Sequence, residues 1–120
     1  MSLDVYLTRK KWVSYDEGTT HTIEDENVYW ANITHNLGAM AAEAGIYQVL
    51  WRPEELEITK ANELIEPLEK GLKDLKEKPD YYKQFNSSNG WGMYEHFVPF
   101  VEKYLEACKQ YPQTIISISR

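Results

Sequence analysis

The feature of this sequence that most constrains its fold is a change in the spacing of its apolar residues near His35. Before that point, Leu3, Val5 and Leu7 alternate with polar or aromatic residues, which is the pattern of a half-buried strand. After it, apolar residues recur every three or four positions, as in a helix that buries one face. A strand pattern returns at residues 114–119. Strands followed by helices and then by one strand predict an α+β domain, with a largely antiparallel sheet and helices packed on one of its faces.

Three N-terminal strands and one C-terminal strand are expected in this sheet. The first covers residues 3–8, a second β-rich run covers 11–15, and the aromatic and β-branched segment 28–33 is the third. Residues 19–27 are polar, with Ile23 as their only notable apolar member. They are therefore predicted to form a hairpin tip or a mobile loop.

The helices are expected between residues 35 and 110. A short helix over residues 37–44 carries small apolar residues, and a last helix has an apolar stripe over residues 97–108. Between them, Thr59 is expected to cap a helix over residues 61–75. Pro67 lies inside that segment and removes a backbone hydrogen bond, so we expect a kink near Ile65 or two abutting helices.

Length, charge and cysteine content limit the class of protein. The chain has 120 residues, 13 basic and 19 acidic side chains, a formal net charge of −6 and one cysteine. One domain over residues 1–120 is expected from this length. One cysteine cannot form an internal disulfide, and no apolar run reaches the roughly 20 residues of a membrane-spanning helix, so we expect a cytoplasmic protein without a membrane partner. The negative charge argues against nucleic acid as a partner, because contacts to phosphates depend on clustered lysine and arginine.

Four strings of the sequence stand out between residues 28 and 111. They are ANITHNLG at residues 31–38, LWRP at 50–53, NGWGMY at 89–94 and FVPFV at 97–101. Together they resemble a pattern of small uncharacterised proteins encoded by bacterial and phage genomes. The resemblance implies a one-domain cytoplasmic accessory protein of phage or prophage origin, and it carries no known activity to transfer.

A first candidate site lies at the junction of the third strand and the first helix. Thr34, His35 and Asn36 are placed where a helix N-terminus presents free backbone N–H groups, which attract an anionic or phosphate ligand. The alternative, and the commoner use of such residues, is that Thr34 or Asn36 caps the helix and His35 is an exposed residue of its first turn.

A second candidate is the turn that contains Asn89 and Trp91. Glycines on both sides of the tryptophan free the backbone and place the ring in or beside a loop, where it can stack on a base, a sugar or a peptide. Tyr94 follows three residues later and is included in this site. The alternative is a turn whose tryptophan closes the end of the core.

Arg52 is a third candidate, since it stands alone in an acidic stretch. Arginine binds carboxylate or phosphate through two parallel hydrogen bonds. The more frequent alternative is a weak surface ion pair, here with Glu54 or Glu55.

Acid–base or metal chemistry would have to come from the histidines. His35, His96 and Glu95 are the candidate catalytic groups, but neighbours on a helix point about 100° apart, so one site does not easily use both Glu95 and His96. His21 is the third histidine. No spacing matches a metal motif or a phosphate loop, so no metal and no cofactor are expected. Cys108 lies on the apolar stripe of the last helix, where an inert buried thiol is normal.

Three functions are weighed on these residues. The leading hypothesis is a non-catalytic binding protein that holds an anionic or nucleotide-like small ligand, or a host protein. One alternative is a small hydrolase or lyase with a His–carboxylate pair, and another is an acidic interaction or inhibitor protein of phage origin. The exposed aromatic residues and the C-terminal strand also permit a homodimer. The residues assigned to the leading hypothesis are His35, Asn36, Arg52, Asn89, Trp91 and Tyr94.

Overall fold

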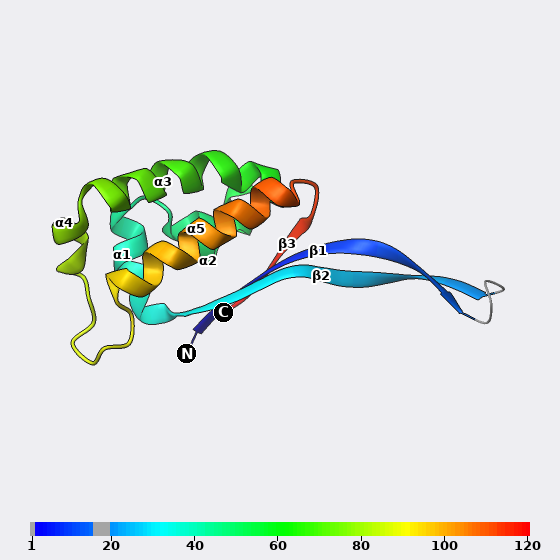
Figure 1. Ribbon diagram of the computed structural model, residues 1–120, viewed down its shortest axis with the longest axis horizontal. Coiled ribbons are helices and arrows are strands. Elements are labelled where there is room, and N and C mark those ends of the chain that lie inside the picture. Colours follow the sequence, from blue (N-terminus) through cyan, green and yellow to red (C-terminus); the bar gives the residue numbers. More distant parts are fainter. Residues whose placement is uncertain (1, 16–19) are drawn as a thin grey trace.

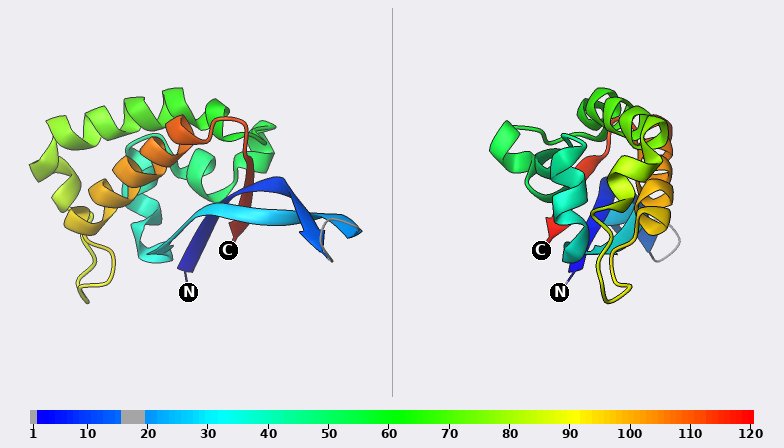
Figure 2. Two further views of the ribbon diagram at one scale, coloured as in Figure 1. Left: turned by 45° about the vertical axis from the view of Figure 1, so that its right-hand side comes forward. Right: turned by 90° about the vertical axis from the view of Figure 1, so that its left-hand side faces the viewer.

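The structure, a computed structural model, describes residues 2–15 and 20–120, without the side chains of residues 14, 15, 20 and 21. Its described strands form an antiparallel sheet in the order β2-β1-β3, and the helices gather on one side of that sheet (Figures 1 and 2). The strands are β1 (Ser2–Tyr15), β2 (Thr20–Thr34) and β3 (Ile115–Ser119). The predicted α+β class is confirmed.

The N-terminal half of the sheet consists of two long strands instead of three short ones. β1 continues without a break through the two runs predicted as separate strands, and β2 includes most of the polar segment 19–27 that was predicted as a loop. The two strands pair in antiparallel register over their whole length, with one shift between Leu7 and Thr8. The tip of this hairpin, residues 16–19, lies outside the described residues.

Opposite charges pair across the two strands in this segment, which has few apolar residues. Arg9 Nε lies 3.1 Å from Glu26 Oε2, and Lys10 Nζ lies 2.6 Å from Asp25 Oδ1. These residues are direct cross-strand partners, and opposite charges at such positions stabilise an antiparallel pair. The sequence pattern of either strand alone does not show this charge pairing, because the favourable electrostatic energy arises only when the two strands lie side by side.

The hairpin of β1 and β2 reaches beyond the rest of the molecule. β3 pairs with β1 only between Asp4 and Thr8, so residues 9–15 and 20–26 form a two-stranded ribbon, which we call the arm (Figure 1). The molecule consequently measures 59 × 28 × 23 Å along its principal axes.

The helical segments follow β2 in a continuous series and end before β3. Within the described residues, every helix is too short or too polar to reach across a bilayer. The segments are η2 (His35–Leu37), α1 (Gly38–Glu43), α2 (Tyr47–Trp51), η3 (Pro53–Leu56), η4 (Ala61–Leu64), α3 (Ile65–Glu77), α4 (Pro79–Lys83) and α5 (Tyr94–Gln110).

The helix predicted over residues 61–75 is divided at the expected place. The 3-10 turn η4 meets α3 at Ile65, which puts Pro67 in the first turn of α3, where a missing N–H costs little. The expected cap is wrong by one residue. Lys60 is the N-cap of η4, and the Glu63 carboxylate accepts from the backbone N–H groups of Lys60 and Thr59 at 3.1 and 3.3 Å.

The core lies between the sheet and the helices. Leu3, Val5 and Leu7 of β1 are fully buried, as their alternation predicts. The apolar stripe of α5 packs above β2, where the Tyr104 ring stacks on Tyr29 with the ring centroids 5.9 Å apart. The alternate residues of each strand therefore point to the opposite side.

That opposite side is not covered by any described helix (Figure 2). We call it the uncovered sheet face and define it by Asp4, Tyr6, Trp30, Asn32 and Ser117. The register places Tyr6 between Trp30 and Ser117, with Asp4 beside Asn32 in the next row. Trp30 is 60% exposed there.

Candidate functional site

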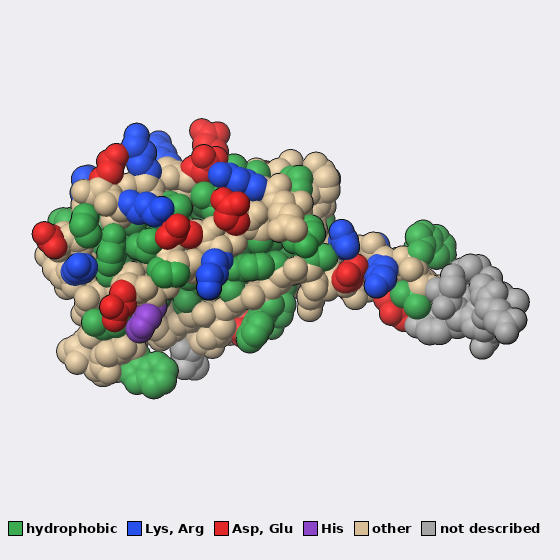
Figure 3. All heavy atoms as spheres, viewed as in Figure 1, with side chains coloured by type: hydrophobic (Ala, Val, Ile, Leu, Met, Phe, Trp, Pro, Cys, Tyr) green, Lys and Arg blue, Asp and Glu red, His purple; other side chains and the backbone are tan. Residues whose placement is uncertain are grey.

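A groove of about 770 Å³ opens at the end of the sheet where β2 passes into η2. It is lined by Ser2, by residues 32–37, by the loop residues 89–92 and by His96 of α5. The groove thus joins two of the sequence strings, ANITHN and NGWG, which are more than fifty residues apart in the chain. Figure 3 shows hydrophobic side chains that project from this edge of the helical body, and a histidine nearby.

The loop is fastened to the strand end by Asn36. Its Nδ2 donates to the Trp91 carbonyl oxygen at 2.9 Å, and its backbone N–H donates to Thr34 Oγ1 at 3.3 Å. Thr34 is therefore the N-cap of η2, which is the capping role that was the alternative to ligand binding at this junction. The adjoining helix α1 has only six residues, so the groove rests on side chains and not on a helix N-terminus.

The turn itself is shaped by Asn89 and two glycines. Asn89 Oδ1 accepts from the Trp91 N–H at 2.9 Å and from Ser87 Oγ at 2.5 Å. Gly90 and Gly92 have φ values of +80° and +107°, a region that L-residues with a side chain rarely adopt. These contacts fix the backbone of the loop and leave the Trp91 ring 70% exposed.

His35 is held by a buried tryptophan. Trp51 Nε1 donates to His35 Nδ1 at 2.9 Å, and Trp51 in turn stacks on Tyr47 with the centroids 5.1 Å apart. A neutral imidazole that accepts at Nδ1 carries its proton at Nε2. His35 is thereby fixed as a hydrogen-bond donor at the groove.

The other candidate catalytic groups do not form a pair. His96 lines the same groove as His35, but it is exposed, and Glu95 is exposed on α5 outside the lining. Among the described contacts, neither His35 nor His96 is hydrogen-bonded or ion-paired to a carboxylate. The side chain of His21 lies outside the described residues. The groove therefore presents two histidines without the acidic partner that orients a general base.

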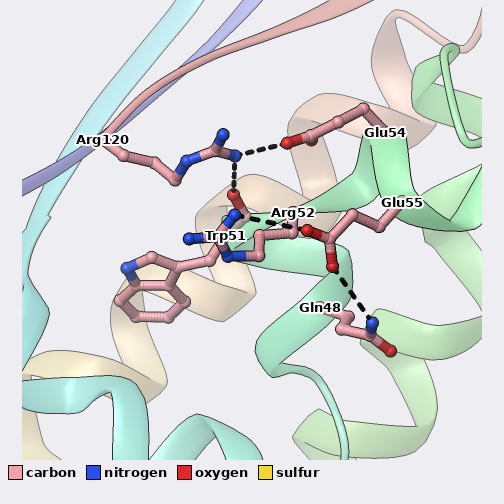
Figure 4. Close-up of polar contacts among 6 residues, drawn as sticks. All are labelled: Gln48, Trp51, Arg52, Glu54, Glu55 and Arg120. Atoms are coloured by element: carbon pink, nitrogen blue, oxygen red, sulfur yellow. Dashed lines mark hydrogen bonds and ion pairs between the residues drawn. The ribbon is translucent and has the colours of Figure 1, made fainter.

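Arg52 lies outside the groove and forms a surface ion pair, which was the alternative to ligand binding for this residue. Its Nη1 lies 3.3 Å from Glu55 Oε2 (Figure 4). A hydrogen bond with Tyr47 and the charge of Glu55 raise the pKa of Arg52. Beside it, Arg120 donates to the Trp51 carbonyl oxygen at 2.7 Å and to Glu54. The structure thus does not bring Arg52 together with the candidate residues that line the groove, and it pairs Arg52 with a carboxylate three residues away.

Tyr94 is also outside the groove lining. Its hydroxyl donates to the Leu75 carbonyl oxygen at 2.7 Å, and its backbone N–H donates to Asn86 Oδ1 at 2.7 Å. Lys83 Nζ lies 5.7 Å from the centroid of its ring. Tyr94 joins α5 to α3 and to the preceding loop, which is a structural role.

Ser2 and Asn32 line the groove although the sequence did not single them out. The signal was present in the alternation of the strands, because both residues belong to the set that points away from the core. Among the described residues, no three His, Cys, Asp or Glu side chains come together as a metal site. Cys108 is buried, and burial raises the pKa of its thiol to about 12.

Comparison with known protein families, with curated proteins and with solved structures finds no match.

Proposed function

We propose that this chain is a non-catalytic binding module whose groove holds a small polar ligand with a ring that stacks on Trp91. The observation that carries the proposal is the state of Trp91, whose ring is 70% exposed while its backbone is bonded to Asn36 and Asn89. An exposed tryptophan forgoes the burial of a large apolar area, and a ligand ring placed on it regains that burial.

The groove surrounds this ring with short polar side chains. Asn36 uses its Nδ2 donor on the loop, so its Oδ1 oxygen remains an acceptor, and His35 supplies an N–H donor at Nε2. Apolar rings with a few fixed polar groups around them are the usual composition of a small-molecule site. A binding role fits these residues better than catalysis, since no described carboxylate partners either histidine.

The charge of the groove favours a neutral ligand over an anionic one. None of the described lining residues is Lys, Arg, Asp or Glu. The expectation of an anionic ligand rested on a helix N-terminus after Thr34 and on Arg52. The structure has only the short turn η2 and the six-residue helix α1 at that junction, and Arg52 pairs with Glu55 outside the groove. We therefore propose a ring that carries hydroxyl or amide groups, and a nucleoside or a sugar meets that description.

Ligand-observed NMR on the full chain tests the proposal with nucleosides, nucleoside monophosphates and neutral monosaccharides. At least one neutral ring compound is expected to bind the wild-type protein, and Trp91→Ala is expected to abolish this binding. Arg52→Ala is the matched control, because it removes a large side chain outside the groove and is expected to leave binding unchanged.

Four outcomes overturn the proposal. Binding that survives Trp91→Ala, or binding of none of the compounds, removes the groove as a ligand site. Conversion of a bound compound that is lost in His35→Gln or His96→Gln supports the hydrolase or lyase alternative. Strongly salt-dependent association with a basic protein, with no small ligand bound, supports the acidic interaction protein.

A further inference from the structure

The groove does not end at the strand that lines it. Ser2 and Asn32 belong both to the groove and to the side of the sheet that faces away from the helices. Along β2, Trp30 follows Asn32 on the same face at a distance of about 6–7 Å, two residues of strand rise. The uncovered sheet face is therefore a direct continuation of the groove.

This continuation contains a second exposed tryptophan and an oriented carboxylate. The Asp4 Oδ1 oxygen accepts from Trp30 Nε1 at 3.2 Å and from Asn32 Nδ2 at 2.8 Å. Trp30 is 60% exposed and has the half-buried Tyr6 as its cross-strand partner. The two hydrogen bonds hold the carboxylate between the groove and the Trp30 ring.

The chemistry of this surface is that of a site for hydroxyl-bearing rings. Aromatic faces provide apolar area for the C–H side of a saturated ring, while the Asp4 carboxylate and the Asn32 amide oxygen accept hydrogen bonds from hydroxyl groups. An exposed tryptophan thus lies at each end of this continuous surface, Trp91 in the groove and Trp30 on the uncovered sheet face. A ligand that uses both must contain several rings in a chain.

We infer that the uncovered sheet face is a second subsite and that the ligand of this protein is a neutral oligosaccharide extending from Trp91 across Asn32 to Trp30. The inference rests on the proposed function of the groove and adds the substrate class to it. One sugar ring stacks on Trp91, and a later ring of the same chain stacks on Trp30.

Single-stranded nucleic acid is the competing chain of rings, because its bases also stack on tryptophan. Proteins that bind it combine such rings with a positively charged path for the phosphates. Neither the described groove lining nor the uncovered sheet face contains a lysine or arginine, and Asp4 would repel a phosphate between the two rings. A neutral glycan avoids this repulsion.

Calorimetric titration of the full chain with neutral oligosaccharides of increasing length tests the inference. Cello-, chito- and malto-oligosaccharides from the monosaccharide to the hexasaccharide are the probes. The affinity for the bound series is expected to rise by about tenfold or more once the chain spans both rings. Trp30→Ala is expected to remove this gain while keeping the affinity for the shortest bound sugar, and Trp91→Ala is expected to weaken binding at every length.

Trp12→Ala is the matched control, because Trp12 is an exposed tryptophan of the arm, away from the path. Far-UV circular dichroism verifies that each variant is folded. An affinity independent of chain length, or a length gain that survives Trp30→Ala, overturns the second subsite and leaves the groove in place. Binding of no oligosaccharide overturns the substrate class, whereas loss of all ring ligands, nucleosides included, overturns the proposed function itself. Length-dependent binding of oligo(dT) that Trp30→Ala abolishes replaces the glycan by nucleic acid.

Discussion

Gly92 lies where the loop that carries Trp91 touches the end of β2. A Cβ built on Gly92 would meet Asn36 Cβ at 2.9 Å, and the φ of +107° is itself strained for any residue with a side chain. We predict that Gly92→Ala lowers the free energy of unfolding by about 2 to 4 kcal/mol and releases the loop. Urea denaturation measures the first effect, and a shift of the Trp91 indole N–H signal in the NMR spectrum reports the second.

Gly90→Ala provides the control for this prediction. Gly90 also has a positive φ, of +80°, but no atom lies within 4 Å of its would-be Cβ. Its substitution is expected to cost only the conformational strain of about 1 to 2 kcal/mol. Equal losses for the two variants would show that the contact with Asn36 does not hold the loop.

Cys108 makes the stability depend on alkaline pH. Burial raises the pKa of its thiol to about 12, from an ordinary value of 9.0, so the thiol stays neutral in the folded protein after it has begun to ionise in the unfolded chain. Its contribution is complete below pH 9 and is lost as the pH rises towards 12. We predict that the free energy of unfolding falls above pH 9, as measured by urea denaturation.

Cys108→Ala separates this effect from the titration of the tyrosines. Burial also raises the pKa of Tyr104, so part of the alkaline decline is expected to remain in the variant. The wild-type thiol is further expected not to react with Ellman's reagent at pH 8 until the protein unfolds. Rapid labelling of the folded protein would contradict its burial.

At the level of single residues, the sequence predicted which residues line the groove better than it predicted which candidates lie outside the groove. His35, Asn36, Asn89 and Trp91 were selected because they flank turns and element ends, and the structure brings them together. Arg52 was selected by the same reasoning, yet its partners are set by the turn of η3, which places Glu55 within reach. The choice between a ligand and a neighbour depends on side-chain geometry, which residue type does not encode.

Among the elements, the arm shows what a one-strand pattern omits. Opposite charges face each other across the hairpin and none of its described residues is buried, so residues 19–27 read as a loop. Helices were easier to predict, since their apolar stripe repeats within one segment. Even the break before α3 was visible, because Pro67 restricts the backbone locally.

The arm is expected to add little to the stability of the body. None of the described buried residues belongs to it, and an isolated two-stranded ribbon is marginally stable. We predict that joining Arg9 to its cross-strand partner Glu26 by Asn-Gly, in place of the intervening residues, changes the free energy of unfolding by less than about 1 kcal/mol. Urea denaturation is the measurement, and a large loss of cooperativity would show that the arm belongs to the folding unit.

On the scale of the whole molecule, the packing of helices on one face of a sheet was predictable from the sequence, whereas the extension of the arm beyond the helices was not. Strands with alternating apolar residues and helices with one apolar stripe require that the helices cover one face of the sheet. These patterns do not fix how far the hairpin of β1 and β2 extends beyond β3. The homodimer that the exposed aromatic residues and the C-terminal strand permit stays a prediction. Trp12 and Ile23 of the arm are 71% and 52% exposed and could contact a second copy of the chain. If they do, light scattering would show that the variant with the shortened arm has lost the dimer.

Arg120 connects distant parts of this molecule to the groove. It follows β3 and donates to the carbonyl oxygen of Trp51 (Figure 4). The indole N–H of Trp51 in turn donates to His35. We predict that Arg120→Ala lowers the free energy of unfolding by about 1 kcal/mol, a modest value because the side chain is partly solvated. The imidazole NMR signals of His35 are expected to shift as well, since α2 loses one of its anchors.

Arg9→Ala tests whether that effect is specific. Arg9 pairs with Glu26 on the arm and contacts neither Trp51 nor the Tyr47 ring that stacks on it, so its loss is expected to leave the His35 signals unchanged. An unchanged His35 spectrum in Arg120→Ala would mean that Trp51 holds its position through the stack on Tyr47 alone. A shift confined to Arg120→Ala would show that the final strand of the sheet helps to set the geometry of a groove formed by residues far from it in sequence.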